Sequence, residues 1–206
     1  MGVAIRTADE RDRELVVRLL DGAFQDDPVS GWVFPDPVHR RATHPKLMAA
    51  FLDIVLAEGR VDLAEDGSAC ALWLSVPADA HPEGHEEDVQ GDESDDAVQL
   101  REAVDPDNER VELIARLTAE IHPAGQPHAY LWMIAVAPDS QGHGLGAALL
   151  RHALDRCDRE GVAAYLEASS ARSSKLYERL GFDHLDRPLD LPDGPRMWPM
   201  WRKPRA

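Results

Sequence analysis

The chain has 206 residues, of which 44% are hydrophobic, and a formal net charge of −16. This length suits one domain with a sizeable core, and the negative charge repels phosphates and excludes general nucleic-acid binding. No apolar run reaches the roughly 18 residues of a membrane helix, and residues 1–10 lack the apolar core of a signal peptide. We therefore expect a cytoplasmic protein with no membrane partner.

The first half of the chain shows strand and helix patterns in alternation. Residues 3–8 alternate as a strand does, and residues 10–24 have helical periodicity that ends before the prolines at 28, 35 and 37. A second helix is predicted over 40–59, and a hairpin with strands 60–64 and 69–76 is predicted around Asp66-Gly67. The helical side chains expected to face the core are Leu15, Leu19, Leu20, Leu47, Phe51, Ile54 and Val55.

Twelve acidic residues lie between Glu83 and Glu109. They predict an acidic, partly mobile insertion at about 80–109 within a single domain of residues 1–206. A solvated loop is the simple interpretation, and a flexible acidic lip that gathers a cationic substrate is the alternative. Helical patterns at 95–104 and 109–121, broken near Pro106, follow or overlap this segment.

The second half predicts the centre of a sheet. Residues 129–137 are almost all apolar, which favours a central strand buried on both faces. A helix at 147–161, a strand at 162–168, a helix at 172–180 and strands at 181–186 and 195–203 follow. Cys70 and Cys157 fall in segments expected to be buried and predict reduced thiols. No Cys/His cluster has zinc spacing, His81 and His85 being a pair at best, so we expect no metal.

"PDSQGHGLGAALL" (138–150) places glycines directly before a helix. Backbone N–H groups at such a helix start attract a phosphate or pyrophosphate. A nucleotide-binding P-loop is excluded because Gly-Lys-Ser/Thr is missing. A dinucleotide fingerprint would use Gly142, Gly144 and Ala147, with Glu167 on the ribose, although the polar link 138–141 and the short remainder of the chain argue against it. A structural turn without a ligand is the third alternative.

Gln141, Gly144 and Gly146 also form Q-x-x-G-x-G, and "LYERLGF" follows at 176–182. With these two motifs the sequence resembles the Gcn5-related N-acetyltransferase (GNAT) superfamily. "VAPDSQGHGLG", "AYLEASSAR" and "LPDGPRMWPMWRKP" resemble the puromycin N-acetyltransferase branch in particular. His143, Ser173 and Ala129 stand where that branch has lysine, asparagine and tryptophan, and the last departure bears on the acceptor pocket.

The resemblance implies a GNAT fold, that is, an α/β (α+β) domain with a mixed, mostly antiparallel central sheet flanked by helices. It implies acetyl-CoA as cosubstrate and no metal. The cofactor-binding residues carried over are Ile134, Ala135, Val136, Gln141, Gly142, His143, Gly144, Leu145, Gly146, Ala147 and Ser173. Of these, Ser173 has an alternative role as a helix cap.

The same resemblance makes Tyr177 the general acid that protonates the departing CoA thiolate. Glu167, acting through a water, is a weaker candidate for the base, and His128 and the Asp26-Asp27 pair are others. No base is needed if the amine arrives neutral. Trp32, Phe34 and Trp73 are candidates for an acceptor cavity, with core packing as the simpler use.

These expectations converge on an enzyme that acetylates the primary amine of a small molecule, such as an aminonucleoside-type antibiotic of the puromycin kind. Acetylation of a protein or peptide amine is the alternative enzyme, and a non-catalytic acyl-CoA-binding regulatory module is the alternative from another class. The expected partner is the small-molecule amine, with the chain acting as a monomer or homodimer.

Overall fold

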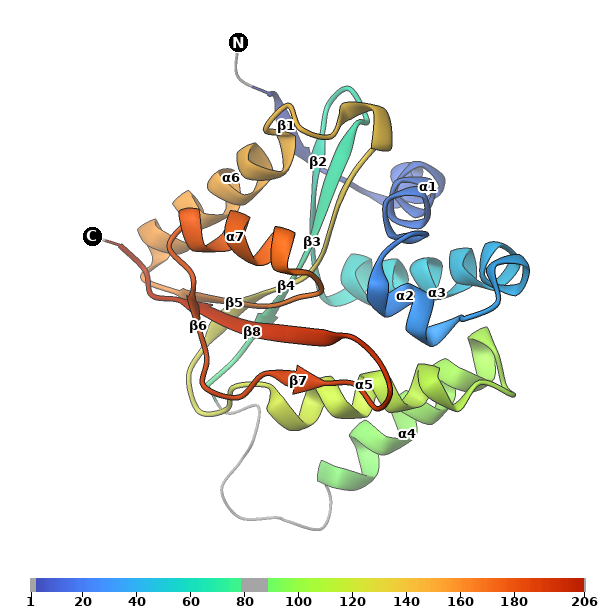
Figure 1. The fold of residues 1–206 in the computed structure, drawn as a ribbon. Coiled ribbons are helices and arrows are strands. Elements are labelled where there is room, and N and C mark those ends of the chain that lie inside the picture. The colour runs from blue at the N-terminus through green and yellow to red at the C-terminus, as the bar shows by residue number, and fades with distance from the viewer. Residues whose placement is uncertain (1–2, 79–88, 206) are drawn as a thin grey trace.

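The computed structural model describes residues 3–78 and 89–205, which form one sheet flanked by helices (Figure 1). The strand order is β1-β2-β3-β4-β5-β8-β6, and β7 pairs with β8. Among the described strands, every pairing is antiparallel except that of β4 with β5. The strands are β1 (Ile5–Thr7), β2 (Gly59–Ala64), β3 (Ala69–Val76), β4 (His128–Val136), β5 (Ala163–Ala168), β6 (Asp183–His184), β7 (Leu189–Asp190) and β8 (Arg196–Arg202).

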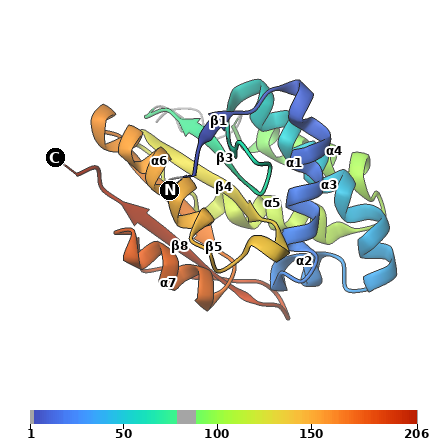
Figure 2. The same ribbon diagram turned by 90° about the horizontal axis from the view of Figure 1, so that it is seen from above.

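The helices divide between the two faces of this sheet (Figures 1 and 2). Those of the first half cover one face, and the last two cover the other. The helices are α1 (Arg13–Phe24), α2 (Pro28–Val33), α3 (Pro37–Glu58), α4 (Val89–Val104), α5 (Glu109–Ile121), α6 (Leu145–Glu160) and α7 (Ala171–Arg179), with short 3₁₀ turns η1 (Glu10–Asp12) and η2 (Pro138–Ser140).

Alternation along the strands creates a separate core on each face. On β3, Cys70 and Leu72 pack toward α1 and α3, whereas Ala71 and Trp73 pack toward α6. The mixed, mostly antiparallel sheet confirms the predicted fold class, and it excludes the doubly wound sheet that a dinucleotide fingerprint requires. Cys70 and Cys157 are both buried, free thiols, as expected.

Two prolines expected to interrupt helices instead begin them. Pro28 and Pro37 occupy the first positions of α2 and α3, where the missing N–H costs nothing. The preceding residues, Asp27 and Asp36, accept hydrogen bonds from the first free amides of those helices. Helices α1, α2 and α3 therefore follow one another with short links, and together they form what we call the helical wall.

Two expectations about burial were wrong, and one about secondary structure was wrong in part. Ile54 of α3 is exposed, and Leu52, which was not expected inside, is fully buried. Strand β4 is not buried on both faces, because five of its nine residues are partly exposed. The helix expected at 95–104 is present but begins earlier, as α4 at Val89, so the acidic segment from 89 onward is helical rather than a loop. Residues 80–88 of that segment, with His81 and His85, lie outside the described residues.

A buried ion pair fastens the end of the chain to α6. Arg202 of β8 donates two hydrogen bonds of 2.7 Å to the carboxylate of Asp158 and one to the Leu180 carbonyl. The arginine side chain is only 4% exposed. The guanidinium lowers the pKa of Asp158 below its usual value.

We expect Asp158→Asn to lower the free energy of unfolding by about 3 kcal/mol, because it leaves a buried guanidinium without its counter-ion. Urea denaturation would measure the change. Asp155→Asn, on the exposed side of the same helix, is the matched control and should change stability by less than about 0.5 kcal/mol. Equal effects of the two variants would contradict this role of the pair.

Candidate functional site

Strands β4 and β5 diverge after a short parallel contact. They pair only from His128 to Tyr130 on β4, opposite Ala163 to Tyr165 on β5, although both strands continue. Beyond this point, β4 keeps its partner β3 on one edge, and β5 keeps β8. The facing edges of β4 and β5 therefore present backbone groups that no strand satisfies, and these groups can bind a ligand with peptide-like amides.

A β-bulge in β4 turns side chains toward one face. Leu72 of β3 pairs with Met133 and Trp73 pairs with Leu131, so Trp132 has no opposite residue. As a result Trp132 and Met133 both pack toward α1 and α3, while Leu131 and Ile134 pack toward α6. Bulges commonly re-aim side chains beside functional sites.

The glycine turn leads from β4 through η2 into α6. Gly142 and Gly144 both have φ of +83°, in the left-handed region that favours glycine, and Gly144 is the N-cap of α6. A Cβ atom at either glycine would meet nothing within 4 Å, so the space in front of the turn is open. A helix start with free amides and open space is suited to an anion.

One large cavity of about 1320 Å³ joins these features. It brings together most residues expected at the site, namely Ile134, Val136, Gln141, Gly142, Gly144, Leu145, Gly146, Ala147, Glu167, Ser173 and Tyr177. Two expected residues do not line it. Ala135 is buried in the core beside α1 and α3, and His143 is exposed, with Nδ1 3.3 Å from the Ser140 carbonyl oxygen.

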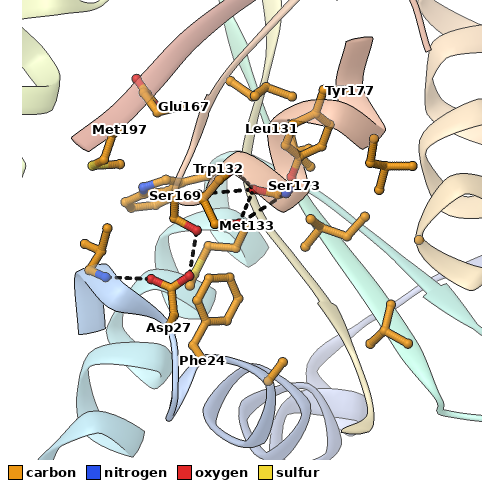
Figure 3. A pocket seen from close by; sticks show the side chains of 18 of the residues that line it. Phe24, Asp27, Leu131, Trp132, Met133, Glu167, Ser169, Ser173, Tyr177 and Met197 are labelled. Atoms are coloured by element: carbon orange, nitrogen blue, oxygen red, sulfur yellow. Dashed lines mark hydrogen bonds between the residues drawn. The ribbon is translucent and has the colours of Figure 1, made fainter. Parts of the chain in front are cut away.

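Tyr177 lies on α7, on the wall of the cavity (Figure 3). Its helix begins with a reciprocal capping box between Ser170 and Ser173, so Ser173 both caps the helix and lines the cavity. Burial, and secondarily the charge of Asp27, raises the pKa of the Tyr177 phenol well above its usual value. The phenol therefore holds its proton at neutral pH and can act as a donor.

Glu167 is a carboxyl at the end of β5 that also lines the cavity. Its Oε2 accepts a 2.7 Å hydrogen bond from the Tyr130 hydroxyl, and its buried Oε1 has no partner among the described residues. The Tyr165 hydroxyl lies nearby without the geometry of a hydrogen bond. Burial raises the pKa of Glu167 to about 7, which suits a group that takes up and releases protons near neutral pH.

Asp27 is a second carboxyl on the cavity wall. It accepts hydrogen bonds from the Val29 amide at 2.8 Å and from the Ser169 hydroxyl at 2.6 Å, which links α2 to the end of β5 (Figure 3). Burial raises its pKa above the usual value. The other base candidates are not at the cavity: Asp26 is exposed, and His128 is buried against Gln126 and His122.

Several cavity residues were not foreseen from the sequence. Phe24, Phe51 and Trp132 are its aromatic residues beside the tyrosines, whereas Trp32, Phe34 and Trp73 are buried in the cores. The exposed guanidiniums of Arg151 and Arg172 border it on α6 and α7. Of these residues, only Arg151 had a signal in the sequence: it lies within the first two turns of the helix that follows the glycines, where its charge can face a bound anion.

Ser30, His44 and Asp21 form a hydrogen-bonded chain in the helical wall. Ser30 Oγ lies 3.1 Å from His44 Nε2, and His44 Nδ1 lies 2.7 Å from Asp21 Oδ1. This arrangement resembles a hydrolytic triad, which also needs free N–H groups to stabilise an oxyanion. The Val29 amide beside Ser30 already donates to Asp27, and the Asp27 carboxylate would repel an oxyanion placed there. The chain instead braces α1, α2 and α3 around Asp27.

Within residues 3–78 and 89–205, no group of three or more His, Cys, Asp or Glu side chains could hold a metal ion. The helices of the described part of the chain include none that is long and apolar enough to cross a membrane.

Known proteins are similar to parts of this sequence and to its fold. Over 58 residues the chain is 52% identical to [ribosomal protein bS18]-alanine N-acetyltransferase of Escherichia coli K12, covering 27% of this chain and 39% of that protein. Over 131 residues it is 31% identical to mycothiol acetyltransferase of Renibacterium salmoninarum, covering 56% and 38%. The chain thus aligns with well under half the length of these two relatives.

A solved structure of histone acetyltransferase HPA2 and related acetyltransferase, from Corynebacterium glutamicum, superposes with a TM-score of 0.73 at 27% identity, covering 100% of this chain and 98% of that one. These comparisons give no support to puromycin as a substrate in particular. The sequence profile of the acetyltransferase (GNAT) family matches residues 68–182, more than half of the chain. The chain therefore belongs to the acetyltransferase (GNAT) family.

Proposed function

We propose that this protein transfers the acetyl group of acetyl-CoA to the primary amine of a small molecule. The observation that carries the proposal is the shared cavity, in which the glycine turn, a neutral tyrosine and a carboxyl of raised pKa meet. Family membership supports the acetyl transfer, and the geometry supports the roles of the residues.

The residues present fit acetyl-CoA. The amides of 142–146 would hold the pyrophosphate at the open start of α6, because glycine leaves room for it there. Arg151 and Arg172 would neutralise phosphate charge. The unpaired edge of β4 at Ile134–Val136 would bind the pantetheine amides. When bound, acetyl-CoA supplies the activated acetyl group as a thioester.

Tyr177 would give its phenolic proton to the sulfur that leaves when the amine takes the acetyl group. The raised pKa keeps that proton in place until negative charge develops nearby. Glu167 would accept the proton that the attacking ammonium loses, directly or through a water. Because the amine attacks the thioester directly, no covalent enzyme intermediate is required.

The enclosed carboxyls and aromatic side chains support a small acceptor, and an aminonucleoside-type amine such as puromycin falls within this class. A protein or peptide amine is the second candidate, favoured by the 52% identity with the bS18-alanine N-acetyltransferase. Release of CoA thiol from acetyl-CoA, measured with puromycin, simple amines, polyamines and an alanine-terminated peptide, tests both. Turnover of the peptide alone would replace the small-molecule proposal.

We expect Tyr177→Phe to lower kcat by about 10²-fold or more, because the leaving thiolate loses its proton donor, while the Kd for acetyl-CoA stays unchanged. Stopped assays of acetylated product together with calorimetric binding would measure both. The control is Lys175→Met, at an exposed position of the same helix. Unchanged turnover in Tyr177→Phe would show that another group is the acid.

We expect kcat/KM of the wild type to rise as the pH increases through about 7, because Glu167 accepts a proton only when ionised. Glu167→Gln should remove this inflection, leaving that of the substrate amine, and lower the plateau by about 10²-fold. A pH profile identical to that of the wild type would show that the amine arrives neutral and needs no base.

The same raised pKa predicts a change in stability. Folded Glu167 holds its proton at pH values where the unfolded side chain has lost it, so the wild type loses stability as the pH rises from about 4.5 to about 7, and the loss levels off above that pH. Between pH 5 and pH 8, Glu167→Gln should therefore gain on the order of 2 kcal/mol relative to the wild type. Chemical denaturation at both pH values measures this, and a pH-independent difference would contradict it.

A further inference from the structure

We infer that the acceptor is a monoamine that carries a flat, apolar body: its ammonium group lies between Asp27 and Glu167, and its body fills the aromatic chamber. The aromatic chamber is the part of the cavity lined by Phe24, Met48, Phe51, Ile114, Trp132 and Met197. This inference rests on the proposed acetyl transfer and names the substrate class that the site selects.

The walls of the aromatic chamber are apolar and partly uncovered. The rings of Phe51 and Trp132 lie with centroids 4.6 Å apart and planes tilted by 46°, and the bulge in β4 turns Trp132 to this side. Phe24, Phe51 and Trp132 are only half-buried, although each packs against the core. An apolar ligand would cover these rings and remove their surface from water.

The two carboxyls at the cavity have no cation to balance them. Among the ion pairs that the described residues form, none includes Asp27 or Glu167. The hydrogen bonds to Asp27 come from a neutral amide and a hydroxyl, which leave acceptor capacity on both oxygens. A buried carboxylate without a counter-ion is unfavourable, so a cationic ligand is bound preferentially.

Positive charge lies elsewhere in the cavity. Arg151 and Arg172 belong to α6 and α7, on the other face of the sheet from α1, α3 and α5, which supply most of the aromatic chamber. The cavity is thus cationic toward the glycine turn and anionic where Asp27 meets Ser169 (Figure 3). This separation orients an amine with its charged end toward the middle of the cavity.

The six side chains that define the aromatic chamber include no carboxylate, hydroxyl or amide that could accept from a second ammonium. Thr118, the hydroxyl residue that α5 contributes to the cavity, already donates to carbonyls of its own helix. A diamine would therefore bury its second ammonium against rings and thioethers without a partner, which is costly. We expect an aromatic monoamine to be preferred over a diamine of similar length.

The first test compares phenethylamine, hexylamine and cadaverine as acceptors. We expect KM for phenethylamine to be at least about tenfold lower than for cadaverine, with hexylamine between them. Calorimetric titration of each amine into protein saturated with CoA should give the same order of Kd without turnover. Cadaverine or a lysine peptide bound and acetylated best would overturn the inference while leaving acetyl transfer intact.

Variants of Phe51 test whether the aromatic chamber selects between the amines. Phe51→Leu should raise KM for phenethylamine several-fold with KM for acetyl-CoA unchanged. Phe51→Glu should shift the preference toward cadaverine by at least about tenfold, because it adds a partner for the second ammonium. Ile54→Glu, at an exposed position of the same helix, controls for added charge. It should change neither KM for phenethylamine nor the preference between phenethylamine and cadaverine.

Asp27→Asn tests the ammonium site. We expect it to weaken phenethylamine binding at least about tenfold while the Kd for acetyl-CoA stays unchanged. Unchanged amine binding would overturn the role of Asp27. Failure of every amine to be acetylated by protein that binds acetyl-CoA would instead overturn the proposed function itself, so the two failures are distinguishable.

Discussion

The early divergence of β4 and β5 is the constraint on which the rest of the site depends. Because their parallel pairing ends at Tyr130 and Tyr165, backbone groups beyond it lack a strand partner, and the sheet opens into a cavity. The same opening uncovers Glu167 at the end of β5 and the bulged Trp132 on β4. A continuous parallel pair would satisfy these backbone groups and close the cavity to which we assign both the cosubstrate and the acceptor.

The cavity contains two carboxyl groups whose ionisation is unfavourable without a cationic ligand. Glu167 and Asp27 both have raised pKa values because burial removes water without supplying a cation. Hydrogen bonds from Tyr130 and Ser169 hold these carboxyls in place but do not neutralise them. Such groups lower the stability of the free protein and would strengthen the binding of the proposed cationic substrate, a common compromise between stability and function.

Local signals in the sequence identified residues that lie together around the glycine turn, and their binding of the cofactor stays a prediction. The glycine turn, α6 and Tyr177 follow from residues close together in the chain, and they meet in one cavity. The acceptor side depends on contacts between distant segments, so it was predicted poorly. The apolar pattern of β4 is that of a buried strand, yet here it lines a cavity, and nothing local distinguishes Phe51 from the buried Phe34.

The family match contains the glycine-turn side of the cavity but only part of the aromatic chamber, namely Ile114 and Trp132. Residues 68–182 contain the glycine turn, Glu167 and Tyr177, whereas Phe24, Asp27, Phe51 and Met197 lie outside. The residues proposed to act on the cosubstrate thus lie in the segment that identifies the family, whereas several residues proposed to hold the acceptor lie on α1 and α3. The hydrogen bond from Ser169 to Asp27 joins the start of α2 to the end of β5, so we expect changes at the other cavity side chains of α1 and α3 to alter the proposed acceptor more than acetyl transfer.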